Sequence, residues 1–183
     1  AVAISEYTAL PKQEAFNIEY WLLEEAKLQR MPAPKSLSGK IALVTGSGGG
    51  IGKAIAHKLA SEGVCIMLSD NHAERLETAK KEFIQLFGKD KVGACLLDVT
   101  DINSIRDAFE TCVLGFGGID ILINNAGLSI SKSMEEHSEK DWDLLYSVLV
   151  KGQMFVSMEA VQVMRKQRMG GDIINIVSKN ALV

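Results

Sequence analysis

Five glycines are concentrated in the segment TGSGGGIG, residues 45–52, which follows an apolar run and leads into a helical pattern. Glycines permit a tight turn, and backbone N–H groups at the start of a helix form a natural binding site for phosphate groups. The residues that we predict to contact a dinucleotide there are Gly46, Ser47, Gly48, Gly50, Ile51 and Gly52. A flexible loop is the alternative for any glycine cluster, but the position between a strand and a helix favours a phosphate-binding turn.

Asp70 stands at the end of the next apolar run, VCIMLSD, roughly 20 residues beyond the glycine turn. A carboxylate at this position accepts hydrogen bonds from the hydroxyls of an adenosine ribose and repels a 2′-phosphate. No Arg or Lys lies within the glycine turn or directly after Asp70 to bind such a phosphate. The sequence therefore predicts NAD in preference to NADP. The alternative is that Asp70 only caps the following helix.

Short apolar runs alternate with helical patterns over residues 37–183. The runs that we expect to be strands are residues 40–45, 64–70, 92–99, 120–125 and 172–177. The expected helices are residues 50–63 with Gly63 as the C-cap, 73–87, 102–116 and 138–168. Apolar strands that alternate with helices indicate a parallel sheet that is covered on both faces. We expect an α/β fold with a doubly wound parallel sheet of Rossmann type.

The first 36 residues differ from this alternation. A helical pattern covers residues 13–29, and the segment RMPAPKSLSGK that follows contains prolines, serines and a glycine. Such residues end a helix and form linkers. The predicted organisation is an N-terminal helical extension and linker, residues 1–36, followed by a dinucleotide-binding domain, residues 37–183.

The helical pattern of residues 138–168 is apolar nearly all round. Ser138 and Asp141 have the spacing of a capping box at its start. A helix of this kind must be covered on two sides, one of them by its own sheet. The second cover is either a partner subunit or another part of the same chain. A homo-oligomer that forms through this helix is the expected assembly.

Composition limits the class of protein. The formal net charge is −3 and no run of Lys or Arg occurs, which argues against a nucleic-acid partner. Charged residues interrupt any signal-peptide pattern, and no stretch approaches the roughly 20 apolar residues of a membrane span. The three cysteines form no CxxC pair, and the three histidines lie far apart. We expect a cytoplasmic protein with free thiols, no metal and no membrane partner.

Four segments occur in the same order as motifs of the short-chain dehydrogenase/reductase family, which this chain therefore resembles. They are TGSGGGIG, LLDVTD, INNAG and GDIINIVS, and together they fall within residues 40–178. The resemblance implies that Asp98 meets the adenine ring with Val99 beside it, and that Asn124 ties neighbouring strands together. It also implies that the cofactor is bordered by Asn125, Ala126 and Gly127.

Ser178 ends the last of these motifs, and the resemblance identifies it as the catalytic serine that hydrogen-bonds the substrate oxygen. In the family, a Tyr-x-x-x-Lys pair follows; the Lys lowers the Tyr pKa, which for a free tyrosine is about 10. This pair does not occur before Val183. We therefore expect a sheet truncated after the fifth strand and a fragment that is inactive by itself. Leu149 stands where the family usually has an Asn that helps to hold a relay water.

The resemblance implies an NAD-dependent oxidoreductase that transfers a hydride between nicotinamide and a small alcohol or aldehyde. The extension EAFNIEYWLLEEAKLQRMP also resembles the joint in bifunctional rhamnulose-1-phosphate aldolase/alcohol dehydrogenases, which implies an upstream aldolase domain and lactaldehyde as substrate. A helix that packs on its own domain is the alternative. Leu149 and the missing pair favour a non-catalytic dinucleotide-binding or oligomer-scaffolding module as the second hypothesis. A sugar-nucleotide epimerase would usually show another glycine spacing.

Overall fold

The structure is a computed structural model that describes residues 11–19, 26–27, 30 and 35–178. The chain divides into two compact units, residues 1–34 and 35–183. In the first unit, α1 (Lys12–Glu19) carries a hydrogen bond from Gln13 Nε2 to Asn17 Oδ1 of 3.1 Å. Beyond Glu19, the predicted helical pattern up to residue 29 lies largely outside the described residues.

The second unit contains a parallel sheet of five strands in the order β3-β2-β1-β4-β5. The strands are β1 (Ile41–Thr45), β2 (Cys65–Asp70), β3 (Val92–Leu96), β4 (Ile121–Asn124) and β5 (Asp172–Asn175). The chain moves outward from β1 to β3 and then returns to the other side of β1. The topological switch point therefore lies between β1 and β4, where ligands bind in folds of this type. The expected doubly wound α/β fold is confirmed.

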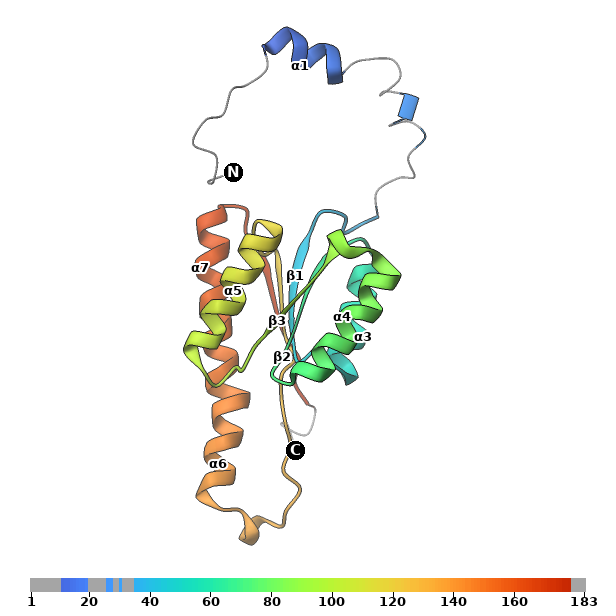
Figure 1. The fold of residues 1–183 in the computed structure, drawn as a ribbon. Coiled ribbons are helices and arrows are strands. Elements are labelled where there is room, and N and C mark those ends of the chain that lie inside the picture. Colours follow the sequence, from blue (N-terminus) through green and yellow to red (C-terminus); the bar gives the residue numbers. More distant parts are fainter. Residues whose placement is uncertain (1–10, 20–25, 28–29, 31–34, 179–183) are drawn as a thin grey trace. The chain divides into compact units, whose positions relative to one another are not determined.

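Helices cover both faces of this sheet. They are α3 (Gly50–Ser61), α4 (Ala73–Phe87), α5 (Ile102–Phe116), α6 (Glu139–Tyr146) and α7 (Gln153–Gln167). Figure 1 shows α3 and α4 on one side of the strands and α5 and α7 on the other. Two short 3-10 turns, η1 (Lys89–Lys91) and η2 (Met134–Glu136), precede β3 and α6 respectively. Each face of the sheet therefore has its own helical layer.

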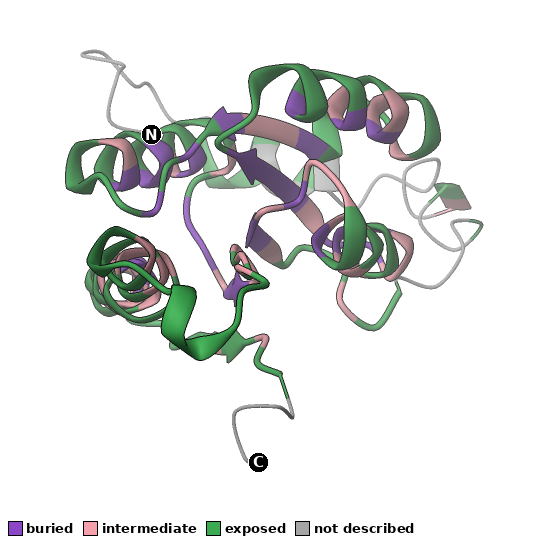
Figure 2. Cartoon of the chain, turned by 90° about the horizontal axis from the view of Figure 1, so that it is seen from below, coloured by how far each residue is buried: buried purple, intermediate pink, exposed green. Residues whose placement is uncertain are grey.

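The apolar core forms two clusters because side chains of a strand alternate between the faces of the sheet. Leu43 and Leu122 belong to the cluster that contains Phe109 of α5, whereas Val44 belongs to the cluster that contains Phe83 of α4. All five side chains are fully or almost fully buried, and Figure 2 shows the buried residues in purple along the central strands. Full burial of one such side chain stabilises the fold by about 1.5–3 kcal/mol.

The residues that precede β1 contact the C-terminal end of α3. Its C-cap is Glu62, and Gly63 follows with φ of 95°, so the glycine lies one position beyond the cap predicted for it. Lys35 Nζ donates to Ser61 O at 2.6 Å, and Leu37 N donates to Glu62 O at 3.3 Å. The last residues of the predicted linker therefore contact the α/β unit.

The helix expected over residues 138–168 consists of α6, a π-helical segment η3 (Ser147–Gly152) and α7. Ser138 and Asp141 form the predicted capping box, with Asp141 N donating to Ser138 Oγ at 3.2 Å. Hydrogen bonds from Lys132 and Ser138 hold the pKa of Asp141 well below its usual range. π-Helical turns are rare and often mark functional sites. The spacing of apolar residues predicted one continuous helix and did not distinguish η3 from the α-helices on either side of it.

One face of α7 packs on the sheet through Val156, Ala160 and Met164, whereas no residue of α6 is buried. By length and composition alone, Glu139–Gln167 is apolar enough to cross a membrane, contrary to the expectation from sequence. Core helices of globular proteins satisfy the same criterion but are mostly buried, whereas 17% of this window is buried. Because α7 contacts β4 and α5, we interpret it as the crossover helix between β4 and β5.

Candidate functional site

The glycine turn connects β1 to α3 at the switch point of the sheet. Gly46 has φ of 65° and Gly50 has φ of 55°, which is the left-handed region that costs other L-residues about 1–2 kcal/mol. Gly49 has an extended φ of −170° that any residue adopts. The turn leads into the N-terminus of α3, whose first N–H groups have no helical partner. These N–H groups are the donors that an anion requires.

Two glycines are required because the backbone comes close to other groups. A Cβ atom at Gly52 would collide with Gly46 O and with Asn125 Nδ2. A Cβ atom at Gly48 would lie 2.7 Å from Asp70 Oδ2. Gly48 and Gly52 therefore close the turn against its neighbours, and they do not line the cavity described below.

Ser47 is fully buried, and its hydrogen bonds are directed to β2. Ser47 N donates to Ser69 O at 2.8 Å, and Ser69 N donates to Ser47 Oγ at 2.8 Å. Ser47 does not line the cavity. Ser47 therefore fixes the turn to β2, and its predicted contact with the cofactor stays a prediction.

Asp70 ends β2 directly beside the glycine turn and is 8% exposed. Its Oδ2 accepts from Gly48 N at 3.0 Å, and its Oδ1 accepts from His72 N at 2.9 Å. The N-cap of α4 is His72, so Asp70 shapes the entry to this helix without being its cap. Each carboxylate oxygen has a further lone pair, which leaves room for a ribose hydroxyl.

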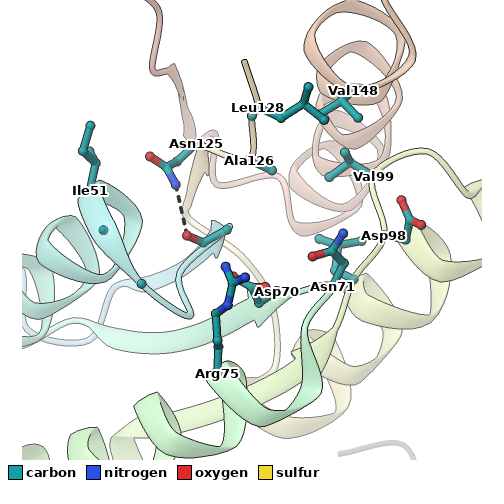
Figure 3. Close-up of a pocket in the computed structure, with 15 residues that line it drawn as sticks. Ile51, Asp70, Asn71, Arg75, Asp98, Val99, Asn125, Ala126, Leu128 and Val148 are labelled. Atoms are coloured by element: carbon teal, nitrogen blue, oxygen red, sulfur yellow. Dashed lines mark hydrogen bonds between the residues drawn. The ribbon is translucent and has the colours of Figure 1, made fainter. Parts of the chain in front are cut away.

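Thr45 is a site residue that the sequence analysis did not identify. Its Oγ1 accepts from Asn125 N and from Ala126 N, both at 2.9 Å. Asn125 Nδ2 in turn donates to Thr45 O at 3.0 Å. It also donates to Gly46 O at 3.2 Å (Figure 3). These bonds join the segment after β4 to the glycine turn. The signal in the sequence was a hydroxyl residue at the last position of a buried strand.

The segment after β3 forms the next wall of the site. Asp98 Oδ1 accepts from Thr100 N at 2.9 Å and from Thr100 Oγ1 at 2.7 Å, and Asp98 N donates to Ser104 Oγ at 2.9 Å. Val99 is buried, and a Cβ atom at Gly152 would lie 2.9 Å from Val99 Cγ2. The loop is therefore fixed between α5 and the π-helical segment.

These segments surround a cavity of about 650 Å³, a volume within the usual range for small-molecule sites. Figure 3 shows Asp70, Arg75 and the neighbouring residues at one end of this cavity, with Val99, Leu128 and Val148 grouped at the other. The predicted residues that line it are Gly46, Gly50, Ile51, Asp70, Asp98, Val99, Asn125, Ala126 and Gly127. The residues that the sequence analysis missed are Gly49, Asn71, Arg75, Leu97, Leu128 and Val148.

Ser178 lies just beyond β5, is exposed and does not line the cavity. The link between β5 and the rest of the site is Asn124, which is 1% exposed. Asn124 Nδ2 donates to Asn175 Oδ1 at 2.9 Å and to Ser157 Oγ at 2.8 Å. Asn124 therefore ties β4 to β5 and to α7, as the resemblance implied.

Leu149 lies in the π-helical segment and packs on the loop after β4. Its Cδ2 atom is 3.3 Å from the position that a Cβ atom would occupy at Gly127. A leucine side chain neither donates nor accepts hydrogen bonds. The helix therefore meets this part of the site through an apolar contact.

The cysteines and histidines do not contribute chemistry to the cavity. Burial raises the pKa of Cys95 to about 12 and that of Cys112 to about 12, with the neighbouring Cys95 adding to the second shift. Neither thiol is a nucleophile near neutral pH, because the thiolate is the reactive form. Among the described residues, no group of three or more His, Cys, Asp or Glu could hold a metal ion.

A glycine turn after the first strand, an acid at the end of the second and a cavity at the switch point define a Rossmann-type dinucleotide-binding domain. Residues 40–183 match the sequence profile of the short chain dehydrogenase family. The chain belongs to this family.

Several relatives in the family share this part of the chain. The chain is 39% identical over 142 residues to the 3-oxoacyl-[acyl-carrier-protein] reductase FabG of Thermotoga maritima, covering 78% of this chain and 56% of that protein. The structure of L-sorbose reductase from Gluconobacter frateurii, complexed with NADPH and L-sorbose, matches with a TM-score of 0.74 and 34% identity. That match covers 80% of this chain and 55% of the reductase.

A further relative matches the extension as well. The chain is 37% identical over 182 residues to the uncharacterized oxidoreductase YuxG of Bacillus subtilis, covering 100% of this chain and 26% of that protein. Residues 1–28 also match the second domain of class II aldolases. The chain thus spans about a quarter of YuxG and little more than half of the other two relatives.

Proposed function

We propose that this chain is the NAD-binding part of an oxidoreductase that transfers a hydride between nicotinamide and a small alcohol or aldehyde. The observation that carries the choice of NAD is the Asp70 carboxylate, which two backbone N–H groups fix at the edge of the cavity. A carboxylate there favours the ribose hydroxyls and opposes a 2′-phosphate. The sorbose reductase relative was solved with NADPH, so the preference for NAD rests on Asp70.

The residues of the cavity fit the parts of such a cofactor. N–H groups of the turn and of α3 would bind the pyrophosphate, and Asp98 would lie near the adenine. Val99, Leu128 and Val148 would exclude water at the opposite, apolar end. Bound there, the dinucleotide supplies or accepts the hydride. Ser178 would hold the substrate oxygen through its hydroxyl group.

The whole protein is proposed to be a bifunctional aldolase/alcohol dehydrogenase with its aldolase domain upstream of this chain. Two matches support this proposal: residues 1–28 with a class II aldolase domain, and the full chain with YuxG. Lactaldehyde is then the proposed substrate. NADH consumption by the full-length protein with lactaldehyde tests this proposal, and activity confined to unrelated carbonyl compounds would contradict it.

For the oligomeric state and the cellular location, we propose what the sequence analysis led us to expect. The exposed apolar side chains of α6 and α7, among them Met154 at 60% exposure, support a homo-oligomer formed through this helix. The free cysteines Cys65, Cys95 and Cys112 support a reducing, cytoplasmic location. Leu149 favours a second candidate function, a dinucleotide-binding or scaffolding module without catalysis. Hydride transfer by the full-length protein with any alcohol would exclude this second candidate.

Calorimetric titration of the chain with NADH and with NADPH tests the binding function. We expect tighter binding of NADH, and we expect Asp70→Asn to weaken it by about tenfold because hydrogen bonds to a charged group are lost. Asp107→Asn, on an exposed position of α5, serves as the control. An unchanged preference for NADH in Asp70→Asn would contradict the assigned role, and binding of neither dinucleotide would overturn the function.

A further inference from the structure

A cation lies at the same end of the cavity as Asp70. Arg75 belongs to the first turn of α4 and lines the cavity together with Asp70 and Asn71 (Figure 3). A Cβ atom at Gly48 would lie 2.7 Å from Asp70 Oδ2 and 3.1 Å from Arg75 Cβ. The Asp70 carboxylate and the stem of Arg75 therefore approach one point of the glycine turn. This end of the cavity contains both a negative and a positive side chain.

The two charged side chains differ in the hydrogen bonds that they make within the protein. Asp70 accepts hydrogen bonds from Gly48 N and His72 N. Arg75 is exposed, and within the described part of the chain its guanidinium group has no hydrogen bond or ion pair. Among the described residues that line the cavity, Arg75 is the one with a positive charge, whereas Asp70 and Asp98 are acidic. The guanidinium donors are available to a ligand.

A guanidinium group has five N–H donors in a planar arrangement that matches two phosphate oxygens at once. The 2′-phosphate of NADP lies on the ribose hydroxyl that would meet Asp70, and so it would enter this same end of the cavity. Repulsion by Asp70 and attraction by Arg75 would then act on one phosphate. We propose that Arg75 binds the 2′-phosphate and makes the site accept NADP(H) as well as NAD(H). Asp70 determines the preference for NAD(H), and Arg75 determines how well the site accepts NADP(H). This inference rests on the proposed dinucleotide-binding function.

Titration of the unaltered chain and of Arg75→Ala with NADPH and NADH tests this assignment. We expect the Kd for NADPH to rise by about tenfold or more, because a charge-assisted hydrogen bond is lost. The Kd for NADH should rise by much less than that for NADPH, because NADH has no 2′-phosphate for Arg75 to bind. Arg75→Lys keeps the charge without the paired donors and should give an intermediate Kd for NADPH. Arg106→Ala removes an exposed arginine from α5, outside the cavity, and is the matched control.

The adenosine half alone provides a second measurement. Adenosine 2′,5′-bisphosphate should lose affinity for Arg75→Ala, and adenosine 5′-phosphate should not. An equal loss for both compounds would show that Arg75 contacts the base or the ribose, and no loss would show that it contacts neither; both results overturn the inference. Binding of NADH without measurable binding of NADPH by the unaltered chain would overturn the inference alone. Binding of neither would overturn the proposed function with it.

Discussion

Strands β1 and β5 belong to one sheet, yet their surroundings differ. Four of the five residues of β1 are buried, whereas in β5 only Ile173 is even partly buried. The helices differ less, since α3 buries Gly52, Ala56 and Ala60 and α7 buries one face, whereas α6 buries no residue. In Figure 2, purple marks the central strands and green covers much of the helix formed by α6 and α7.

This difference indicates which region determines cofactor binding and which region is available for contacts with other protein surfaces. Around β1, hydrogen bonds within the described residues fix the side chains of Thr45, Ser47 and Asp70. A site that is ordered before the ligand arrives loses less conformational entropy on binding. Around β5, the backbone ladder with β4 and the hydrogen bond from Asn124 to Asn175 hold the strand, and most of its residues are exposed. We therefore expect cofactor affinity to depend on the first region, and contacts with other protein surfaces to depend on the second.

The largest effect is expected at Gly52. Gly52→Ala introduces a methyl group against Gly46 O and Asn125 Nδ2, both of which are fixed by the turn. Overpacking of this kind costs about 1–3 kcal/mol or more of folding free energy. We expect a lower thermal midpoint and loss of measurable NADH binding by calorimetry.

Gly49→Ala is the control for this variant, because no atom lies within 4 Å of its added Cβ and its φ is extended. The Gly49 variant should keep the unaltered midpoint even if the methyl group weakens NADH binding. Equal thermal midpoints for the two variants would remove the distinction between a tightly packed turn and an open one.

An intermediate effect is expected at Asn124, where the two regions meet. Asn124→Ala removes the donor to Ser157 Oγ and Asn175 Oδ1, and each such hydrogen bond contributes about 0.5–1.5 kcal/mol to stability. Chemical denaturation should show this loss, whereas NADH affinity should change little because Asn124 does not line the cavity. Asn103→Ala, on an exposed position of α5, is the control. A loss of affinity as large as that of Gly52→Ala would show that the two regions are not separate.

The smallest effect on stability is expected on the exposed face of α7. Met158 is 45% exposed, so Met158→Lys should change the free energy of unfolding by no more than about 0.5 kcal/mol. Its effect should appear in assembly, since a charge in an apolar subunit interface opposes association. Analytical ultracentrifugation of the full-length protein should show smaller species. An unchanged mass would contradict the proposed interface, and a large fall in stability would show that the chain itself covers this face.

The fold could be predicted from the sequence because the patterns that indicate its strands and helices are local. Each apolar run from residue 40 onward became a strand, and the observed strands end earlier than the runs mainly where the chain turns into the site. The runs 92–99 and 120–125 end as β3 and β4 at Leu96 and Asn124, and the residues after them form walls of the cavity. Hydropathy does not separate a strand from the loop that continues it.

The residues of the candidate site could be predicted where a sequence motif includes them. Glycine spacing and the acid at the end of the second strand indicated the turn and Asp70. Arg75 was missed, although it stands only one helical turn into α4, because the search for a cation covered the turn and the residue directly after Asp70. The sequence does not reveal the direction in which a turn residue points, and the structure shows that Ser47 is bonded to Ser69 of β2.

The sequence by itself determined the alternation of strands and helices, the glycine turn and the acid beside it, because these depend on neighbours within one turn or one strand. Only the tertiary structure decided that Thr45 bonds to Asn125, that Ser47 faces β2, and that Arg75 shares a cavity wall with Asp70. The physical reason is the crossover connection. Parallel strands place side by side residues that are far apart in the chain, and side-chain directions there follow from packing between elements rather than from local sequence.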